Sequence, residues 1–560
     1  MLQLSRRLSV AFCLMILFWL TACAPQAAST DTSTAESTVP AGEEAMTSSQ
    51  AEQLRIAIVG DESTLTPYTY ITGYPGWNMM TLQYDTLYQL DLEGIPQPWL
   101  VTAAETSEDG LTVTLDLRED VTWHDGEPFT AEDVKFTFDY FVQYPQSRFT
   151  RALRPVASTA VEGDYRVILT LSAPAPSFEL STLADVPILP QHIWAEVTTP
   201  DEYVFESGTN IGTGPYKLVE YEPDQFYRFE ANADYFTGAP NINELVFVNF
   251  ADEAGTLAAL RSGEVDMLSN PVAPEQIELL AAQPNLKVQS GPLYTTQMIT
   301  YDMQKSPFDR LEVRKAMELA INRQDLVDTV YLGAATVGNP GWIHPASPYY
   351  NPNVTPTYDP AQAQQILDDA GIVDSDGDGV RELDGTPLSF EFLVNSSDAL
   401  RLRLAELVSQ MLAEAGIQAN VSSVEQATWE EAVWPGFDVT NGRNYEMAMW
   451  GWSAPVQADP VRFPNLVSSD PTIGTSNLSG YVSEEADALS SQIIVEADDE
   501  TRIELVKQLQ ELVAEDLPFI LLLYPDGAYA HNAEVYDGWR FMTGQGVLHK
   551  LSLLPESALP

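Results

Sequence analysis

Basic residues are scarce in this chain of 560 residues. It contains 27 Lys and Arg against 81 Asp and Glu, which gives a formal net charge of −54. Proteins bind nucleic acids and anionic lipids through patches of positive charge, and so acidic a surface repels both. The composition therefore argues against nucleic acid as a partner, and we interpret most acidic residues as a solvated surface.

Catalytic motifs are also scarce. The 5 histidines are scattered, and none occurs in a His-Glu-x-x-His array. The chain has no Gly-x-Ser-x-Gly sequence and no phosphate-binding loop ending in Gly-Lys, and Gly212-Thr213-Gly214 lacks the third glycine of a dinucleotide-binding loop. We expect no enzyme activity and no required cofactor, although a pair of catalytic carboxylates would leave no local pattern.

Cysteine is limited to Cys13 and Cys23, both near the start of the chain. Two arginines at positions 6 and 7 precede an apolar stretch, residues 8–20, which is shorter than the about 20 residues of a transmembrane helix. A positive start followed by a short apolar core is typical of a secretory signal. The sequence Leu20-Thr21-Ala22-Cys23 that follows resembles the lipobox of bacterial lipoproteins.

This lipobox implies cleavage after Ala22 and lipidation of Cys23; an ordinary signal peptide with a chance cysteine is the alternative. Cleavage removes Cys13, so the mature chain is expected to have no intramolecular disulfide. Residues 24–50 are mainly Ser, Thr, Ala and Glu, which bury too little apolar surface to fold. We predict a signal peptide over 1–22 and a disordered tether over 23–50.

The rest of the chain is long enough for two or more domains, and its two halves differ in pattern. Before about residue 300, period-two alternation predicts strands near 54–59, 113–117, 167–171, 216–221 and 226–231, with one helix that Thr130 and Asp133 cap. After it, helical spacing predicts one helix that the pair Asp309 and Glu312 caps and a second helix that ends at Gly416. Strands are predicted near 388–394, 419–424, 445–450 and 519–524. Alternating helices and strands predict an α/β fold.

Several sequences resemble family 5 extracellular solute-binding proteins, which serve ABC importers of peptides, nickel and some oligosaccharides. The longest is Val121–Val134, VTWHDGEPFTAEDV. Four more follow in the order of the family: Gly212–Tyr216, Leu260–Asp266, Val313–Met317 and Tyr358-Asp359-Pro360. The resemblance covers residues 54–540, roughly. We interpret the longest sequence, His124 included, as scaffold, because its Asp125-Gly126 turn and capped helix need no ligand.

The resemblance implies a two-lobed periplasmic-binding-protein fold with a hinge and an enlarged first lobe. We assign lobe I to residues 51–297 and 525–560, and lobe II to 298–524. A peptide or another small solute would bind between the lobes, and hinge closure would present the closed receptor to an ABC permease and its ATPase. The expected protein is an exported monomer, held by its lipid on the extracytoplasmic face of a membrane, in the periplasm or at the cell surface. A secreted hydrolase and a calcium-dependent surface lipoprotein are the alternatives.

An acidic loop near residue 376 carries a candidate calcium site. Asp374, Asp376 and Asp378 occupy positions one, three and five of a sequence that resembles the start of an EF-hand loop, with Gly379 at six. Position twelve is Gly385 instead of a glutamate, so Glu382 or Asp384 would have to complete the site. The alternative is a plain helix-to-strand turn, and any ion would be structural.

The ligand pocket is predicted from a second resemblance. In peptide-binding family members, a Gly-Trp sequence after a lobe II strand is followed by an Asp that pairs with the amino terminus of the ligand. Here Pro455 falls at the position of that Asp, and Asp459 follows four residues later. A proline offers no charge and no donor, so we predict an aromatic, neutral pocket that does not anchor a free amine unless the loop turns Asp459 inward. The candidate ligand-binding residues are Trp452, Asp459, Trp342, Tyr524, Tyr74 and Trp77.

Overall fold

A computed structural model describes residues 51–70, 75–205, 208–452 and 459–560 of the chain. The predicted signal peptide and tether, Cys23, Tyr74 and Pro455 lie outside these residues. Within the described part, a mixed sheet of 12 strands runs in the order β18-β17-β19-β13-β20-β11-β1-β10-β9-β8, with β12 and β14 also paired to β20. Its strands are β1 (Ala51–Val59), β8 (Tyr216–Glu222), β9 (Phe226–Ala231), β10 (Ile242–Phe250), β11 (Met267–Leu268), β12 (Leu286–Pro292), β13 (Gln297–Tyr301), β14 (Ala335–Val337), β17 (Ser389–Asn395), β18 (Gln418–Val424), β19 (Met447–Trp450) and β20 (Phe519–Asn532).

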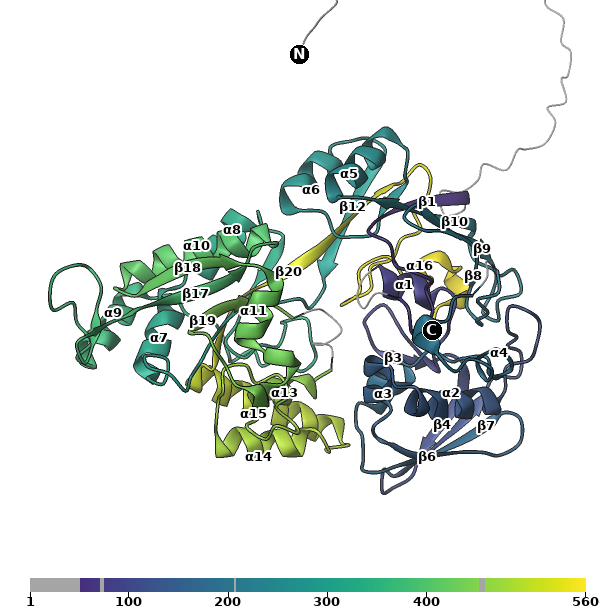
Figure 1. The fold of residues 1–560 in the computed structure, drawn as a ribbon, viewed down its shortest axis with the longest axis horizontal. Helices are drawn as coiled ribbons and strands as arrows, with labels where there is room; N and C mark the ends of the chain where they lie inside the picture. The colour runs from purple at the N-terminus through teal and green to yellow at the C-terminus, as the bar shows by residue number, and fades with distance from the viewer. Residues whose placement is uncertain (1–50, 71–74, 206–207, 453–458) are drawn as a thin grey trace, which may run out of the picture. The chain divides into compact units, whose positions relative to one another are not determined.

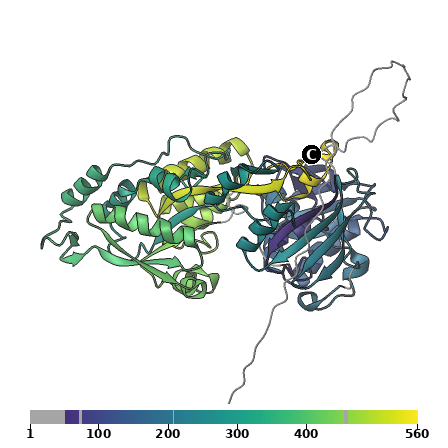
Figure 2. The same ribbon diagram turned by 90° about the horizontal axis from the view of Figure 1, so that it is seen from above.

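The long strand β20 connects the two halves of this sheet. Its first half pairs with β13 and β14, and its second half, from Asp526, pairs with β12 and β11. Figure 1 shows β20 in yellow with β12 near one end, and Figure 2 shows the same strand after a quarter turn. The buried clusters divide the described chain into two lobes, because clusters built on residues 298–524 share no residue with those built on 51–297 and 525–560.

Lobe II packs helices on both faces of β20. Ile520 and Leu522 join one buried cluster with residues of α7, α8 and α10, whereas Phe519 and Leu521 join another with residues of α13, α14 and α15. This division follows from the period of two in a strand, which sends alternate side chains to opposite faces. The helices of lobe II are α7 (Leu311–Ala320), α8 (Arg323–Val330), α9 (Pro360–Asp369), α10 (Ala399–Glu414), α11 (Gln426–Val433), α13 (Arg462–Val467), α14 (Glu484–Ile493) and α15 (Asp499–Asp516).

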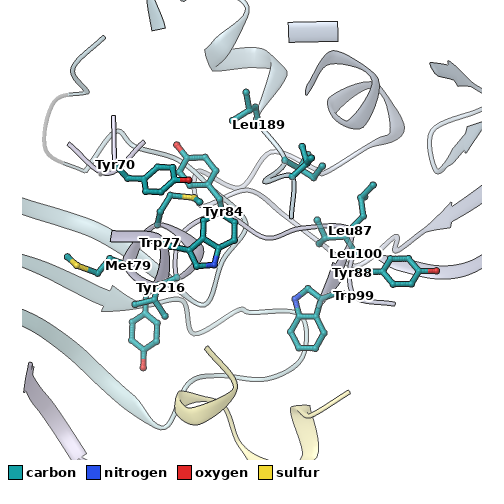
Figure 3. Packing of buried hydrophobic residues seen from close by; sticks show 14 of the residues in the cluster. Tyr70, Trp77, Met79, Tyr84, Leu87, Tyr88, Trp99, Leu100, Leu189 and Tyr216 are labelled. Atoms are coloured by element: carbon teal, nitrogen blue, oxygen red, sulfur yellow. The ribbon is translucent and has the colours of Figure 1, made fainter. Parts of the chain in front are cut away.

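Lobe I adds a four-stranded antiparallel sheet in the order β4-β5-β7-β6 and a large aromatic core. Figure 3 shows part of this core, in which Trp77, Tyr70 and Tyr84 are among the buried side chains. The additional elements of this lobe are β2 (Tyr88–Leu90), β3 (Pro96–Pro98), β4 (Val101–Thr106), β5 (Thr112–Leu117), β6 (Val156–Val161), β7 (Arg166–Leu171), α1 (Gly76–Thr81), α2 (Ala131–Gln143), α3 (Ser147–Ala152), a π-helix η1 (Glu179–Leu183), α4 (Gln191–Trp194), α5 (Glu253–Ser262), α6 (Pro274–Ala281) and α16 (Lys550–Leu553).

A buried ion pair ties the end of the chain to the first part of lobe I. The ammonium group of Lys550 contacts the carboxylate of Asp85, and both side chains are almost fully buried. The same carboxylate also accepts hydrogen bonds from Trp99 Nε1 at 3.1 Å, Tyr235 Oη at 2.9 Å and Thr213 Oγ1 at 3.0 Å. These donors satisfy the buried charge, which would otherwise be costly.

Two of the recognised sequences meet in space, and the contact is structural. His124 Nε2 bonds to the carbonyl of Gly214 at 2.9 Å, and its Nδ1 accepts from the amide of Gly212 at 3.2 Å. A Cβ on Gly212 would lie 1.9 Å from the carbonyl oxygen of Gln83, so only glycine fits there. Burial lowers the pKa of His124 to about 4. These contacts assign the long recognised sequence to the scaffold.

Most predicted elements are present, and one predicted cap is wrong. Helix α2 begins with the predicted capping box, in which Asp133 Oδ2 accepts from the amide of Thr130 at 2.9 Å. Gly416 follows α10 with φ of 81°, as expected of a helix stop. Asp309, however, does not cap α7: the N-cap is Arg310, which makes no capping hydrogen bond, because the amide of Asp309 already closes a turn with Lys305.

Candidate ligand-binding site

Four tryptophans surround the end of strand β19. The ring of Trp450 stacks on that of Trp429 with centroids 4.3 Å apart, and Trp452 packs edge-on against Trp450 at 5.6 Å and Trp434 at 5.8 Å. Trp429 lies in α11, and Trp434 follows its last residue. None of the four indole nitrogens has a hydrogen-bond partner among the described residues. We call Trp429, Trp434, Trp450 and Trp452 the tryptophan cluster.

Gly451 fixes the position of this cluster on the sheet. The amide of Trp452 donates to Thr296 Oγ1 at 2.9 Å, and the amide of Thr296 donates to the carbonyl of Trp452 at 3.0 Å. A Cβ on Gly451 would lie 2.2 Å from the carbonyl oxygen of Thr296. The backbone therefore approaches its neighbour more closely than any other residue type would permit.

Of two cavities in the described part of the chain, one has the predicted ligand contact Trp452 in its lining. The first, of about 10 Å³, is lined by residues that include Trp450, Trp452 and Phe519, and it has room for about one water molecule. The second, of about 510 Å³, lies beside β12, β14 and β20, with Gly291, His344 and Asp526 in its lining. Its size is that of a small-ligand site. Burial raises the pKa of Asp526 and lowers that of His344 to about 4.

Asp459 is buried, and its carboxylate is already engaged. Asp459 Oδ1 accepts from Ser177 Oγ at 2.7 Å and from the amide of Val461 at 3.0 Å. Ser177 belongs to lobe I, so this contact joins the two lobes across 282 residues of sequence. The sequence offered Asp459 as a partner for the amino terminus of a ligand. In this structure its carboxylate instead connects the two lobes.

Trp342 and Tyr524 are core residues in this structure. Both are fully buried; Trp342 stacks on Phe463 with centroids 5.5 Å apart. The hydroxyl of Tyr524 donates to the carbonyls of Trp342 and Ile343 at 3.0 Å, and it accepts from the Asn339 side chain at 2.7 Å. Neither aromatic ring is exposed. These two predicted ligand contacts therefore do not form a common ligand-facing surface with Trp452.

Trp77 lies apart from the tryptophan cluster, in lobe I beside an arginine. It is 7% exposed, and the guanidinium of Arg148 lies 3.7 Å from the centre of its ring. Arg148 also forms an ion pair with Asp185 at 2.5 Å. A cation above an aromatic face is attracted by the ring quadrupole, so Trp77 helps to hold Arg148 in place. Tyr74, the remaining predicted contact, lies outside the described residues.

The acidic loop brings four carboxylates together. Asp374, Asp376, Asp378 and Glu382 each offer an oxygen within 4.8 Å of the others, and the three aspartates are exposed. Asp374 accepts backbone amides from Gly377 at 2.6 Å and Gly379 at 3.0 Å. Of the two residues that the sequence offers to complete the site, Glu382 belongs to this group. Hard oxygen donors suit Ca²⁺, and the same amide contacts would also stabilise a plain turn.

The comparison with protein families identifies the chain. The model of bacterial extracellular solute-binding proteins, family 5 (middle), matches residues 96–474. The chain belongs to this family. Two relatives cover most of it: the oligopeptide-binding protein AppA of Bacillus subtilis, 27% identical over 505 residues (87% of this chain and 89% of AppA), and di/tripeptide-binding protein 3 of Pseudomonas aeruginosa, 26% identical over 512 residues (87% and 92%). A putative ABC transporter peptide-binding protein of Brucella ovis is 32% identical over 374 residues, 65% of this chain and 67% of that protein.

Solved structures show the same fold. NikA of Brucella suis, in complex with Fe(III)-EDTA, superposes with a TM-score of 0.78 at 24% identity and covers 90% of this chain and 100% of its own. AppA of Bacillus subtilis, in complex with a nonapeptide, superposes with a TM-score of 0.71 at 24% identity. The match covers 91% of this chain and 100% of the AppA chain. The predicted two-lobed α/β fold of a periplasmic binding protein is confirmed.

The family assignment confirms the predicted role. The chain is an extracytoplasmic solute-binding receptor, and its relatives are named as binding proteins rather than enzymes. Among the described residues, no helix combines the length and the apolar character needed to cross a bilayer.

Sequence reasoning missed the partners of Trp452. Four of the 11 tryptophans fall between positions 429 and 452, and this local enrichment was a usable signal. Ser177 had no such signal, because nothing in the sequence relates a serine of lobe I to an aspartate 282 residues later.

Proposed function

We propose that this receptor binds short peptides or similar small solutes against the tryptophan cluster, and that it does so without an acid for a free amino terminus. The observation that carries the proposal is the pair of hydrogen bonds between Trp452 and Thr296, with the close approach of Gly451 to Thr296, which holds aromatic surface at the end of β19. Rings of this kind contact apolar side chains and sugars alike. The names of the relatives, which include oligopeptide-binding and di/tripeptide-binding proteins, favour peptides.

The engaged carboxylate of Asp459 supports the second half of the proposal. A buried ammonium group needs a charged or hydrogen-bonded partner, and Asp459 already accepts from Ser177 and Val461. Residues 453–458 contain no acidic side chain. The ligand is therefore held by ring contacts and by groups other than its amine, and Trp452 and Asp459 bound the proposed pocket.

A pool of short peptides, offered with free and with acetylated amino termini, tests this function. We expect wild-type protein to retain both pools to a similar extent, as measured by native mass spectrometry, and Trp452→Ala to retain much less of either. Asp459→Asn should not alter the preference between the pools, with the exposed Asp234→Asn as the matched control. Tight binding of free-amine peptides, abolished by acetylation and by Asp459→Asn, would make this an ordinary amine-anchoring receptor.

We also propose that the receptor is anchored by a lipid on Cys23 and delivers its ligand to an ABC permease and its ATPase. The supporting observation is the lipobox-like sequence before a Ser/Thr-rich segment. One acyl chain binds a membrane only marginally, so a diacylated cysteine would be needed for stable attachment. Cys23→Ser is expected to move the protein from the membrane to the soluble fraction, whereas Cys13→Ser, within the predicted signal peptide, should not. A Cys23→Ser protein that stays membrane-bound contradicts the anchor.

For the acidic loop, we propose a structural calcium ion held by Asp374, Asp376, Asp378 and Glu382, with no part in ligand binding. The support is the convergence of four carboxylates within 4.8 Å. Mutual repulsion makes such a group unfavourable without a cation, although exposure to water reduces this cost. The competing interpretation is an acidic turn that its own amide contacts stabilise.

A further inference from the structure

Phe437 is an exposed aromatic residue with an unfavourable backbone conformation. Its side chain is 59% exposed, and its φ of 56° lies in the left-handed region. A Cβ makes this region unfavourable for residues other than glycine, and an apolar ring left in water contributes no burial energy. Neither feature helps the chain to fold. A backbone outlier without a structural reason indicates a functional one.

Other bulky apolar residues with positive φ do have a structural reason. Most of them are buried, so that packing offsets the cost of the backbone: Leu65, Tyr294, Trp342 and Leu517. Leu332 is 60% exposed, but it comes directly after the C-cap of α8, where a left-handed residue commonly ends a helix. Helix α11 ends at Val433, four residues before Phe437, so helix termination does not explain Phe437.

The loop that carries Phe437 is held by hydrogen bonds of its own backbone. The amide of Phe437 donates to the carbonyl of Trp434 at 3.0 Å. At the base of the loop, the amide of Asn444 donates to the carbonyl of Ala432 at 2.8 Å. The loop backbone, rather than burial of the ring, therefore sets the position of Phe437.

The ring of Phe437 continues the tryptophan cluster. It meets Trp434 edge-on with centroids 5.4 Å apart, and Trp434 in turn meets Trp452 edge-on at 5.8 Å. Trp434 and Trp452 are half-buried, whereas Phe437 is exposed. The aromatic surface that begins at the end of β19 thus extends outwards to a ring in contact with solvent.

We propose that Phe437 is a specificity-determining residue whose ring contacts a large apolar side chain of the bound peptide. Such a side chain, placed against Phe437, removes from water a ring that is otherwise exposed. Because the loop already holds this ring in place, little further ordering accompanies binding. This inference rests on the proposed function and adds to it the ligand class: peptides with a large apolar side chain, in preference to peptides of small and polar residues.

The test uses two pools of synthetic tetrapeptides with identical termini. One pool carries Phe or Leu among its residues, and the other contains only Ala and Ser. Wild-type protein is expected to retain the Phe/Leu pool at least about tenfold better, as measured by native mass spectrometry, because an apolar group is buried on binding. Phe437→Asn should lower retention of the Phe/Leu pool by about tenfold and leave that of the Ala/Ser pool unchanged.

Stability distinguishes this role from a structural one. Asparagine tolerates the left-handed region better than phenylalanine, so Phe437→Asn should be at least as stable as wild type in urea denaturation. A residue required for the fold would instead lose stability on this substitution. Weaker binding by a protein of equal or higher stability is the result expected of a ligand contact.

Leu332→Asn is the matched control, because Leu332 is equally exposed and has φ of 52°. It follows α8, which packs with Met447 and Met449 of β19, whereas α11 packs with Ala448 on the opposite face of the sheet. This variant should retain both pools as wild type does.

Three results would overturn this role of Phe437 and leave peptide binding intact. They are equal retention of both pools by wild-type protein, a Phe437→Asn protein that retains the Phe/Leu pool as wild type does, and a Phe437→Asn protein that is less stable than wild type. Retention of neither pool by wild-type protein would overturn peptide binding itself, and the role of Phe437 with it.

Discussion

At the scale of single residues, Gly451 is required because its backbone lies too close to Thr296 for a side chain. Its Cβ, if present, would lie 2.2 Å from the carbonyl oxygen of Thr296, which is backbone and cannot rotate away. Gly451→Ala is therefore expected to shift β19 against β13 and to lower the free energy of unfolding by about 1–3 kcal/mol, with weaker peptide binding. Urea denaturation and the peptide retention assay measure the two effects.

A second glycine provides the control for this prediction. Gly255 lies inside α5, where a Cβ would make ordinary contacts at 3.4 Å or more. Gly255→Ala should leave stability unchanged or raise it slightly, because alanine is the better helix former. A Gly451→Ala protein as stable as Gly255→Ala would contradict the steric account of the tryptophan cluster.

The candidate residues were partly predictable one at a time. Trp452 was chosen as the tryptophan of the recognised pair Gly451-Trp452, and the structure places it in an aromatic cluster. Trp342 and Tyr524 were chosen for the same chemistry, yet both are fully buried. Aromatic residues serve cores and binding sites equally well, so residue type alone does not distinguish the two.

At the scale of elements, the local signals that succeeded were those with a complete motif. The capping box of α2 contains both of its residues, and the structure forms both of its contacts. The pair Asp309 and Glu312 has the same spacing before α7. However, the amide of Asp309 donates to the carbonyl of Lys305 in the preceding turn, and the helix begins two residues later. A cap depends on the path of the chain before the helix, which the spacing does not encode.

The acidic loop gives a prediction at this scale. If Asp374, Asp376, Asp378 and Glu382 hold calcium, addition of the ion should raise the melting temperature, and a chelator should lower it by the same amount. Asp376→Asn together with Glu382→Gln should remove the response, whereas exposed Asp234→Asn should not. Calorimetry that detects no calcium binding, with no change in melting after chelation, would leave the loop as a plain turn.

At the scale of the whole molecule, the ion pair between Lys550 and Asp85 joins segments 465 residues apart in sequence. Lys550→Met leaves Asp85 charged and buried without its cation, and is expected to lower the free energy of unfolding by about 3–5 kcal/mol. The double variant Lys550→Met with Asp85→Asn should recover part of this loss, because it removes the unpaired charge. Urea denaturation measures both. A single variant no less stable than the double variant would contradict a structural role for the pair.

Buried histidines make the stability depend on pH. Burial lowers the pKa of His124, His344 and His549 to about 4, below the ordinary value of 6.5. The unfolded chain therefore binds protons first as the pH falls, so the free energy of unfolding decreases from pH 6.5 towards pH 4, by on the order of 1–3 kcal/mol per residue. Urea denaturation across this range should show the loss, and His124→Gln should reduce its slope. A flat profile would contradict neutral burial of these rings.

The sequence by itself determined the family, the α/β class and most elements of this receptor, because motifs, caps and alternating patterns depend on residues close together in the chain. Only the tertiary structure decided which side chains face each other. Ser177 meets Asp459 across 282 residues, and Lys550 meets Asp85 across 465. Such neighbours depend on how β20 and the helices around it pack the two lobes, and the packing of distant segments leaves no periodic trace in a single sequence.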